Sequence, residues 1–151
     1  MSDKRSVQLP ALPDATQLVA AAVSLPLRER DYAMLAVLVR VQHCRHDEAM
    51  VLIDALLALG ERTPEVLLAR AVVESALDRH EAVLDTIREL DRIDPPEFRA
   101  GRVIDERVRV RSFMKARATF GLTGALDAEG RASLDFYLRE GRSRGKPSST
   151  R

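Results

Sequence analysis

Aromatic residues and cysteine are scarce in this sequence. Among 151 residues there are two tyrosines, four phenylalanines, one cysteine and no tryptophan. A single cysteine excludes an internal disulfide framework. The shortage of aromatic residues disfavours a β-sheet protein, because pleated surfaces are enriched in aromatic and β-branched side chains. The remaining composition, 46% apolar and 31% charged and rich in alanine, leucine and arginine, predicts a single all-α domain.

Long hydrophobic runs are also missing. The polar N-terminal residues lead into Pro10 and Pro13, where a signal peptide would have an apolar run. The longest weakly polar stretch, 15–25, contains three polar side chains and is well short of the ~20 residues that a membrane-spanning helix needs. We therefore expect a cytoplasmic protein without membrane insertion.

The sequence contains no motif for catalysis or cofactor binding. It has no glycine-rich phosphate loop, no His-Glu-x-x-His helix and no Cys-x-x-Cys pair. His43, Cys44 and His46 are the only dense group of metal-ligating residues and lack a fourth ligand, and a Cys44 nucleophile with a neighbouring histidine as base has equally little support. We expect the histidines to bond carbonyls at the preceding helix end. The prediction is no enzyme, no cofactor and no metal.

Proline, glycine and capping residues divide the chain into helices. Thr63 before Pro64 predicts a helix start, Asp47 predicts an N-cap, and Gly60 predicts a helix end. The expected helices cover about 15–24, 28–44, 48–59, 64–77, 81–93, 97–118 and 132–139. The predicted organisation is a flexible leader over 1–13, one helical domain over 14–140 and a disordered basic tail over 141–151.

The most informative pattern is internal repetition. The Arg-His-Asp turn at 45–47 recurs as Arg-His-Glu at 79–81, and the same offset aligns apolar positions such as Leu38 with Val72. This offset matches the 34-residue period of helix, turn and helix that is typical of tetratricopeptide repeats. Two repeats are predicted, with a degenerate third starting near Phe98. The usual aromatic landmark is absent, Cys44 and Asp78 replace the turn glycine, and a plain helical bundle remains the alternative.

Stacked repeats curve, and the first helix of each pair lines the concave side. Such a groove accepts an amphipathic helix from a partner. The residues expected to line it are Met34, Leu38, Val41, Leu68, Val72, Ser75, Arg102 and Arg109. In an alternative interpretation, the chain's own helix 15–24 or its last helix fills part of this groove as core.

The net charge of +1 conceals an uneven distribution. Residues 45–96 carry 12 acidic and 6 basic side chains, whereas residues 97–117 carry 7 basic and 3 acidic ones. The two regions either pair with each other or meet different partners. The arginines of 99–117 lack interleaved stacking aromatics, so we do not expect nucleic acid as a partner, and a basic nucleic-acid-binding regulator is the weaker alternative.

The run from Gln42 to Leu59 carries a family resemblance. After the repeat turn, the string Leu-Ile-Asp-Ala-Leu-Leu-Ala-Leu at 52–59 resembles the small tetratricopeptide-type chaperones of bacterial type III secretion systems, which serve export substrates and needle components. The resemblance covers about 33–96. It implies a cytoplasmic chaperone that holds a small helical secreted client in its groove, with a co-chaperone or export-gate component as a further partner. A general tetratricopeptide scaffold for protein–protein interaction is the alternative.

Overall fold

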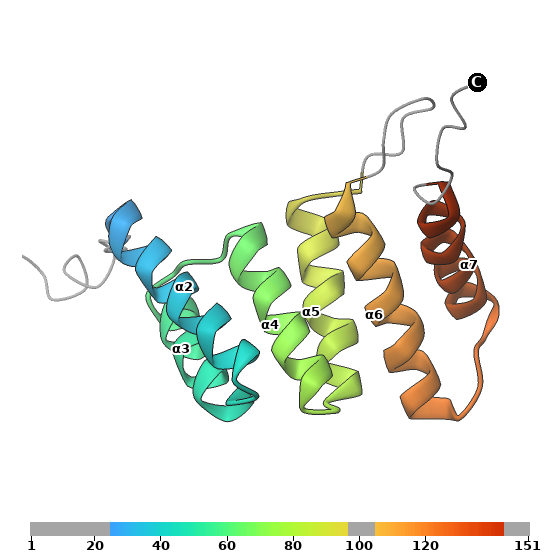
Figure 1. Cartoon of the computed structure of the whole chain (residues 1–151), viewed down its shortest axis with the longest axis horizontal. Coiled ribbons are helices and arrows are strands. Elements are labelled where there is room, and N and C mark those ends of the chain that lie inside the picture. Colours follow the sequence, from blue (N-terminus) through green and yellow to red (C-terminus); the bar gives the residue numbers. More distant parts are fainter. Residues whose placement is uncertain (1–24, 97–104, 144–151) are drawn as a thin grey trace, which may run out of the picture.

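The computed structural model describes residues 25–96 and 105–143, and all regular structure within them is α-helical (Figure 1). This confirms the all-α prediction. The helices are α2 (Leu27–Gln42), α3 (His46–Ala58), α4 (Pro64–Ala76), α5 (His80–Ile93), α6 (Glu106–Thr123) and α7 (Ala128–Ser143). The expected leader, the helix 15–24 and most of the basic tail lie outside the described residues.

Successive helices form three antiparallel pairs that stand in one row. In Figure 1, α2 and α3 lie at one end of the row, α4 and α5 in the middle, and α6 and α7 at the other end. In this view the N-termini of α2, α4 and α6 all lie at the top. Each pair packs on the next, so the fold is a helical-hairpin stack, as the repetition predicts.

The first two pairs keep the register of the repeat through their turns. The helices α2 and α4 end at the equivalent positions Gln42 and Ala76, and α3 and α5 begin at the equivalent positions His46 and His80. Within the turns, Cys44 and Asp78 have φ angles of 56° and 54°. This left-handed conformation strains a residue with a Cβ atom by about 1–2 kcal/mol. Both turns therefore keep the geometry that a glycine would favour without the glycine itself.

The capping predictions have mixed outcomes. Thr63 caps α4, since its hydroxyl accepts a hydrogen bond from the backbone N–H of Val66 at 3.4 Å, and Gly60 has a left-handed φ of 85°. The prediction for Asp47 is wrong, because α3 already begins at His46. The expected bond from His46 to the preceding helix end is also wrong: its Nδ1 atom is buried without a hydrogen-bond partner among the described residues.

The third pair departs from the register of the repeat. A turn at the same offset from Asp78 would fall at Ser112, yet α6 runs through this position without a break. No glycine or proline interrupts 106–120, so the helix continues until Gly124, which has a left-handed φ of 68°. The predicted start near Phe98 lies outside the described residues. Helix α7 begins four residues before the expected 132 and covers the first three residues of the predicted tail.

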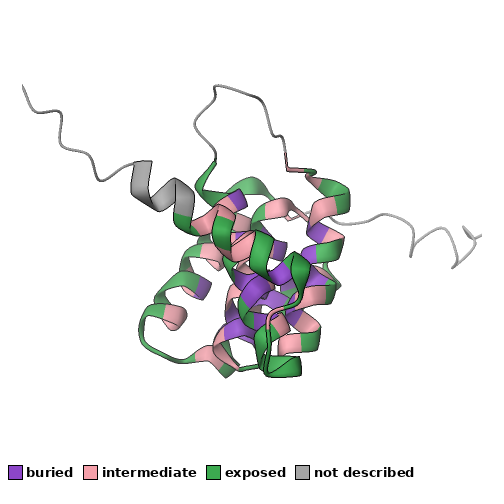
Figure 2. Ribbon diagram, turned by 90° about the vertical axis from the view of Figure 1, so that its right-hand side faces the viewer, coloured by how far each residue is buried: buried purple, intermediate pink, exposed green. Residues whose placement is uncertain are grey.

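The buried residues of the described chain lie on the inside of the stack (Figure 2), and most of the apolar ones belong to two clusters. The first joins α2, α3 and α4 and includes Val37, Ile53 and Val66. The second joins α4, α5 and α6 and includes Ile87 and Met114. Helix α4 therefore contributes to both clusters, and the boundary between them runs along this helix.

Candidate functional site

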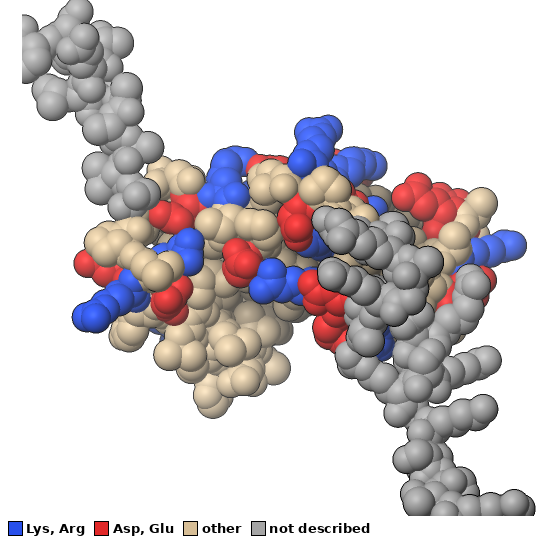
Figure 3. Space-filling view, turned by 90° about the horizontal axis from the view of Figure 1, so that it is seen from above, with Lys and Arg blue, Asp and Glu red and all other residues tan. Residues whose placement is uncertain are grey.

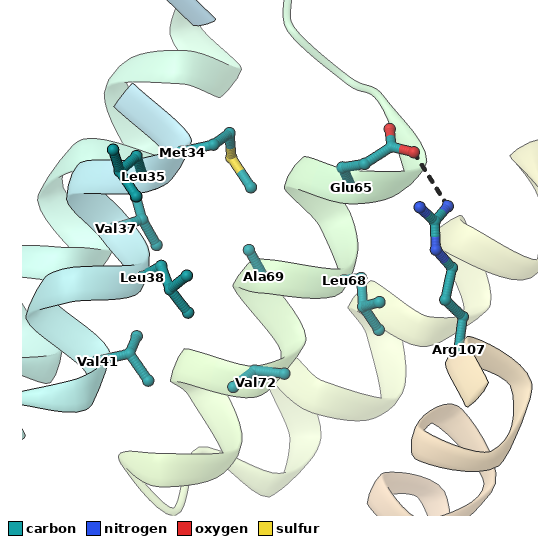
Figure 4. A pocket seen from close by; sticks show the side chains of 10 residues that line it. All are labelled: Met34, Leu35, Val37, Leu38, Val41, Glu65, Leu68, Ala69, Val72 and Arg107. Carbon is teal, nitrogen blue, oxygen red and sulfur yellow. Dashed lines mark hydrogen bonds and ion pairs between the residues drawn. The ribbon is translucent and has the colours of Figure 1, made fainter. Parts of the chain in front are cut away.

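A pocket of about 520 Å³ lies between α2 and α4, the first helices of the first two pairs (Figure 4). Its walls are almost entirely apolar, and the two charged residues lie at one end. The lining residues are Met34, Leu35, Val37, Leu38, Val41, Glu65, Leu68, Ala69, Val72 and Arg107. We call this hollow the α2/α4 groove.

Helical spacing and the repeat together explain why these side chains meet. On α2 they occupy positions 34, 35, 37, 38 and 41, which fall on one broad face of a helix. On α4 the apolar residues occupy 68, 69 and 72, which are the repeat equivalents of positions 34, 35 and 38. The same three repeat positions therefore face each other from neighbouring pairs.

The groove is firm at its base and open at its mouth. Val37 is 2% exposed and belongs to the first core cluster, against which Met34 and Val41 also pack. Leu35 and Leu38 are 56% and 52% exposed. Two large aliphatic side chains thus contact solvent beside a hollow whose base is continuous with the core, an arrangement that indicates a binding surface.

One end of the groove carries an ion pair. Arg107 of α6 donates a hydrogen bond from Nη1 to Oε1 of Glu65, in the first turn of α4, at 3.0 Å. The pKa of Glu65 lies below its usual value, chiefly because its own backbone N–H donates to the carboxylate, with further hydrogen bonds from Arg107 and Thr63. Both side chains are about half exposed. The pair therefore remains accessible to a ligand in the groove.

Polar bonds also connect α4 to α6, the first helix of the third pair. Arg117 donates to the hydroxyl of Ser75 at 3.2 Å and to Asp78 at 3.0 Å, near the far end of α4. Arg107 makes the corresponding bond at the near end. Between these two points the second core cluster fills the space. Among the described residues, the α2/α4 groove therefore does not continue between α4 and α6.

The uneven charge of the sequence is explained in part by bonds within the chain. Arg111, only 4% exposed, donates to the carboxylate and, at 2.7 Å, to the backbone carbonyl of Asp94. Lys115 donates to Asp91 at 2.7 Å. Figure 3 shows basic and acidic side chains interspersed over the upper face, with no large area of one sign. Basic α6 thus pairs with the acidic repeats, one of the two options that the sequence leaves open.

Five of the eight predicted groove residues line the α2/α4 groove: Met34, Leu38, Val41, Leu68 and Val72. Of the other three, Ser75 and Arg109 do not line it. Ser75 is 7% exposed and held by Arg117, while Arg102 lies outside the described residues. The guanidinium of Arg109 lies 5.1 Å from the ring centroid of Tyr137 on α7, because α6 does not keep the register of the first two pairs.

Five lining residues were not predicted: Leu35, Val37, Glu65, Ala69 and Arg107. The repeat itself contains a signal for two of them, because Leu35 and Ala69 are equivalent positions adjacent to the predicted Met34 and Leu68. No comparable signal exists for Arg107. Its position depends on where α6 begins, and the period of the repeat does not fix this.

The last helix does not fill the groove. Helix α7 packs on α6, where Tyr137 lies 5.1 Å from Phe113 between ring centroids, and it contributes no residue to the groove lining. The interpretation of α7 as groove core is therefore wrong. The other segment considered for this role, 15–24, lies outside the described residues.

Two other kinds of site are absent from the described part of the chain. No group of three or more metal-ligating side chains occurs among the described residues, and none of their helices is both long and apolar enough to cross a membrane. Comparison with protein-family models, curated proteins and solved structures finds no match for this chain. The groove is therefore the feature of this chain that points to a function.

Proposed function

We propose that this chain is a non-enzymatic helical-repeat protein that binds an amphipathic helix of a partner in the α2/α4 groove. The observation that carries the proposal is the open, almost wholly apolar hollow with Leu35 and Leu38 more than half exposed at its mouth. Seating an apolar helix face in an apolar groove is a recurrent mode of peptide recognition.

The dimensions of the groove suit a short helical segment. The lining residues of α2 run from 34 to 41, which corresponds to about 10 Å along a helix. A partner helix would contact the groove over about two turns, with anchors three or four residues apart. Each buried aliphatic anchor contributes roughly 1.5–3 kcal/mol before the cost of ordering the partner is subtracted. Two or three anchors are enough for a reversible complex.

The finer proposal is a chaperone of type III secretion, whose client is a small helical secreted protein. Its support is the resemblance carried by 42–59, together with a groove between the same two repeats. In this role the groove covers the client's apolar stripe in the cytoplasm until export. A general interaction scaffold uses the same groove, and the identity of the bound protein separates the two.

Copurification from the native host, followed by mass spectrometry, tests the proposal. Tagged wild type is compared with Leu38→Asp and Leu68→Asp, which place a charge in the groove. The matched control is Val51→Asp, because Val51 is an aliphatic residue of α3 that is 67% exposed and does not line the groove. Circular dichroism checks that each variant is folded.

We expect one partner to accompany wild type and the Val51 variant and to be lost from both groove variants. A secreted helical protein as that partner supports the chaperone role, and another kind of protein supports a scaffold. Retention of the same partner by folded Leu38→Asp and Leu68→Asp would exclude the groove as the binding site.

A further inference from the structure

We infer that the partner's helix carries a carboxylate at the end of its apolar stripe, and that this carboxylate binds Arg107. The inference rests on the proposed function and adds to it the charge and the direction of the bound helix. It starts from the asymmetry of the groove: Glu65 and Arg107 lie at one end, whereas Val41 and Val72 lie at the other (Figure 4).

The guanidinium of this ion pair has hydrogen-bonding capacity left. Glu65 accepts a hydrogen bond from Arg107 at its Oε1 atom, in the first turn of α4. A guanidinium has five N–H donors, and among the described residues the side-chain bond that the structure gives for Arg107 goes from Nη1 to Glu65. An incoming carboxylate gains bonds from the other donors of Arg107, whereas an incoming cation must compete with Arg107 for Oε1 of Glu65.

Exposure allows this binding. The side chains of Arg107 and Glu65 are 47% and 50% exposed, so a carboxylate can approach without burying an unpaired charge. The neighbouring acid, Asp105, accepts a hydrogen bond from the backbone N–H of Arg107 and serves as the N-cap of α6. It therefore stabilises the position of Arg107 without occupying its guanidinium.

Helix dipoles favour the same direction. The helices α4 and α6 both begin at the end where the ion pair lies. Helix N-termini carry a partial positive charge, and the C-terminus of a bound helix carries a partial negative one. A partner with its C-terminal end at Arg107 runs antiparallel to α2 and α4, and its own dipole adds to the attraction between carboxylate and guanidinium.

A displayed peptide library tests charge and direction without a known partner. The probes are helix-favouring peptides on an alanine and glutamine background, with three leucines fixed over two turns and both flanks randomised. Selection uses the full chain as wild type, as Arg107→Gln and as Leu38→Asp. Selected peptides are then synthesised with a C-terminal Glu and an amidated end, or with Gln and a free carboxylate, to separate the two sources of a carboxylate.

We expect acidic residues to be enriched in the C-terminal flank on wild type, with a roughly two- to five-fold affinity advantage that Arg107→Gln removes. Enrichment of basic residues, or of acidic ones in the N-terminal flank, contradicts the inference, as does an unchanged preference on Arg107→Gln. Leucine peptides that bind in a Leu38-dependent way without a flank preference refute the inference and leave the proposed function standing. Selection that is equal on wild type and Leu38→Asp refutes both.

Discussion

Glu74 is an acidic residue in the interior of the stack. Its side chain is 2% exposed on α4, and its two carboxylate oxygens have different partners. Oε1 accepts a hydrogen bond from Nε of Arg70 at 2.7 Å, and Oε2 accepts one from the hydroxyl of Thr86 on α5, also at 2.7 Å. A buried carboxylate is tolerated only when such bonds replace its hydration. The residue therefore links the two helices of the second pair through a specific polar contact.

Replacing Thr86 by valine tests this contact. Valine keeps the branched shape but removes the donor, which leaves one buried oxygen of Glu74 without its partner. We expect the free energy of unfolding, measured by urea denaturation, to fall by roughly 1–3 kcal/mol. The matched control is Thr119→Val on α6, a half-buried threonine for whose hydroxyl no hydrogen bond is seen within the described residues, its backbone carbonyl being the acceptor of the Thr123 hydroxyl. Equal effects of the two substitutions would show that the contact adds nothing specific.

Single residues also show what the sequence could predict about the groove. Met34, Leu38, Leu68 and Val72 were identifiable because spacing on a helix and the offset of the repeat both act locally. Arg107 was not, since its place beside Glu65 depends on the packing of α6 across the stack. Local periodicity thus predicts the walls of the groove but not the ion pair at its end.

Among the elements, the helices α2 to α5 were predictable from local signals together with the repeat, whereas the position of α6 does not follow the repeat. The starts and ends of α2 to α5 follow from nearby signals such as Thr63 and Gly60, and they agree with the expected bounds within a few residues. The period of the repeat would place a turn at Ser112, whereas the local sequence predicts one helix through this position, and α6 runs through it without a break. Nothing in 106–120 breaks a helix, so local propensity determined the outcome.

Besides the apolar contacts of the second cluster, polar bonds attach helix α6 to α5 and its C-cap: Arg111 binds Asp94 and Lys115 binds Asp91. Substituting methionine for Arg111 removes the bonds to Asp94 but keeps an unbranched side chain in the buried site. We expect a loss of roughly 1.5–3 kcal/mol in unfolding free energy and faster hydrogen exchange in α6 and α7. Arg107→Met, which breaks a half-exposed pair on the same helix, serves as control and is expected to cost less than about 1 kcal/mol. A cost for Arg111→Met no larger than that of the control contradicts this attachment.

At the scale of the whole molecule, the two joints of the stack are built differently. Among the described residues, α4 and α6 are joined by the ion pairs of Arg107 and Arg117 at opposite ends of the interface. The ion pairs described for α2 lie within α2 or lead to α3, and its joint with α4 contains the groove. Among the described residues, the joint without ion pairs is the one that contains the α2/α4 groove.

The salt dependence of stability distinguishes the ion pairs of the joint between α4 and α6 from its apolar contacts. Because the net charge is only +1, raising the salt concentration relieves little overall repulsion, and its electrostatic effect reports on specific pairs. From about 0.1 M to about 1 M NaCl the screening length falls from about 10 Å to about 3 Å. We expect the exposed pairs of Arg107 and Arg117 to be weakened, with a combined loss of roughly 0.5–2 kcal/mol relative to a chain that lacks them.

The comparison chain is the double variant Arg107→Gln and Arg117→Gln, measured by urea unfolding at both salt concentrations. Salt also strengthens apolar burial, but this contribution is common to both chains and cancels in the difference. The wild type should therefore lose its stability advantage over the double variant as salt rises, while Arg111, being buried, keeps its bonds to Asp94 in both chains. An advantage that is unchanged at about 1 M NaCl would show that Arg107 and Arg117 do not stabilise the joint between α4 and α6 through screened ion pairs.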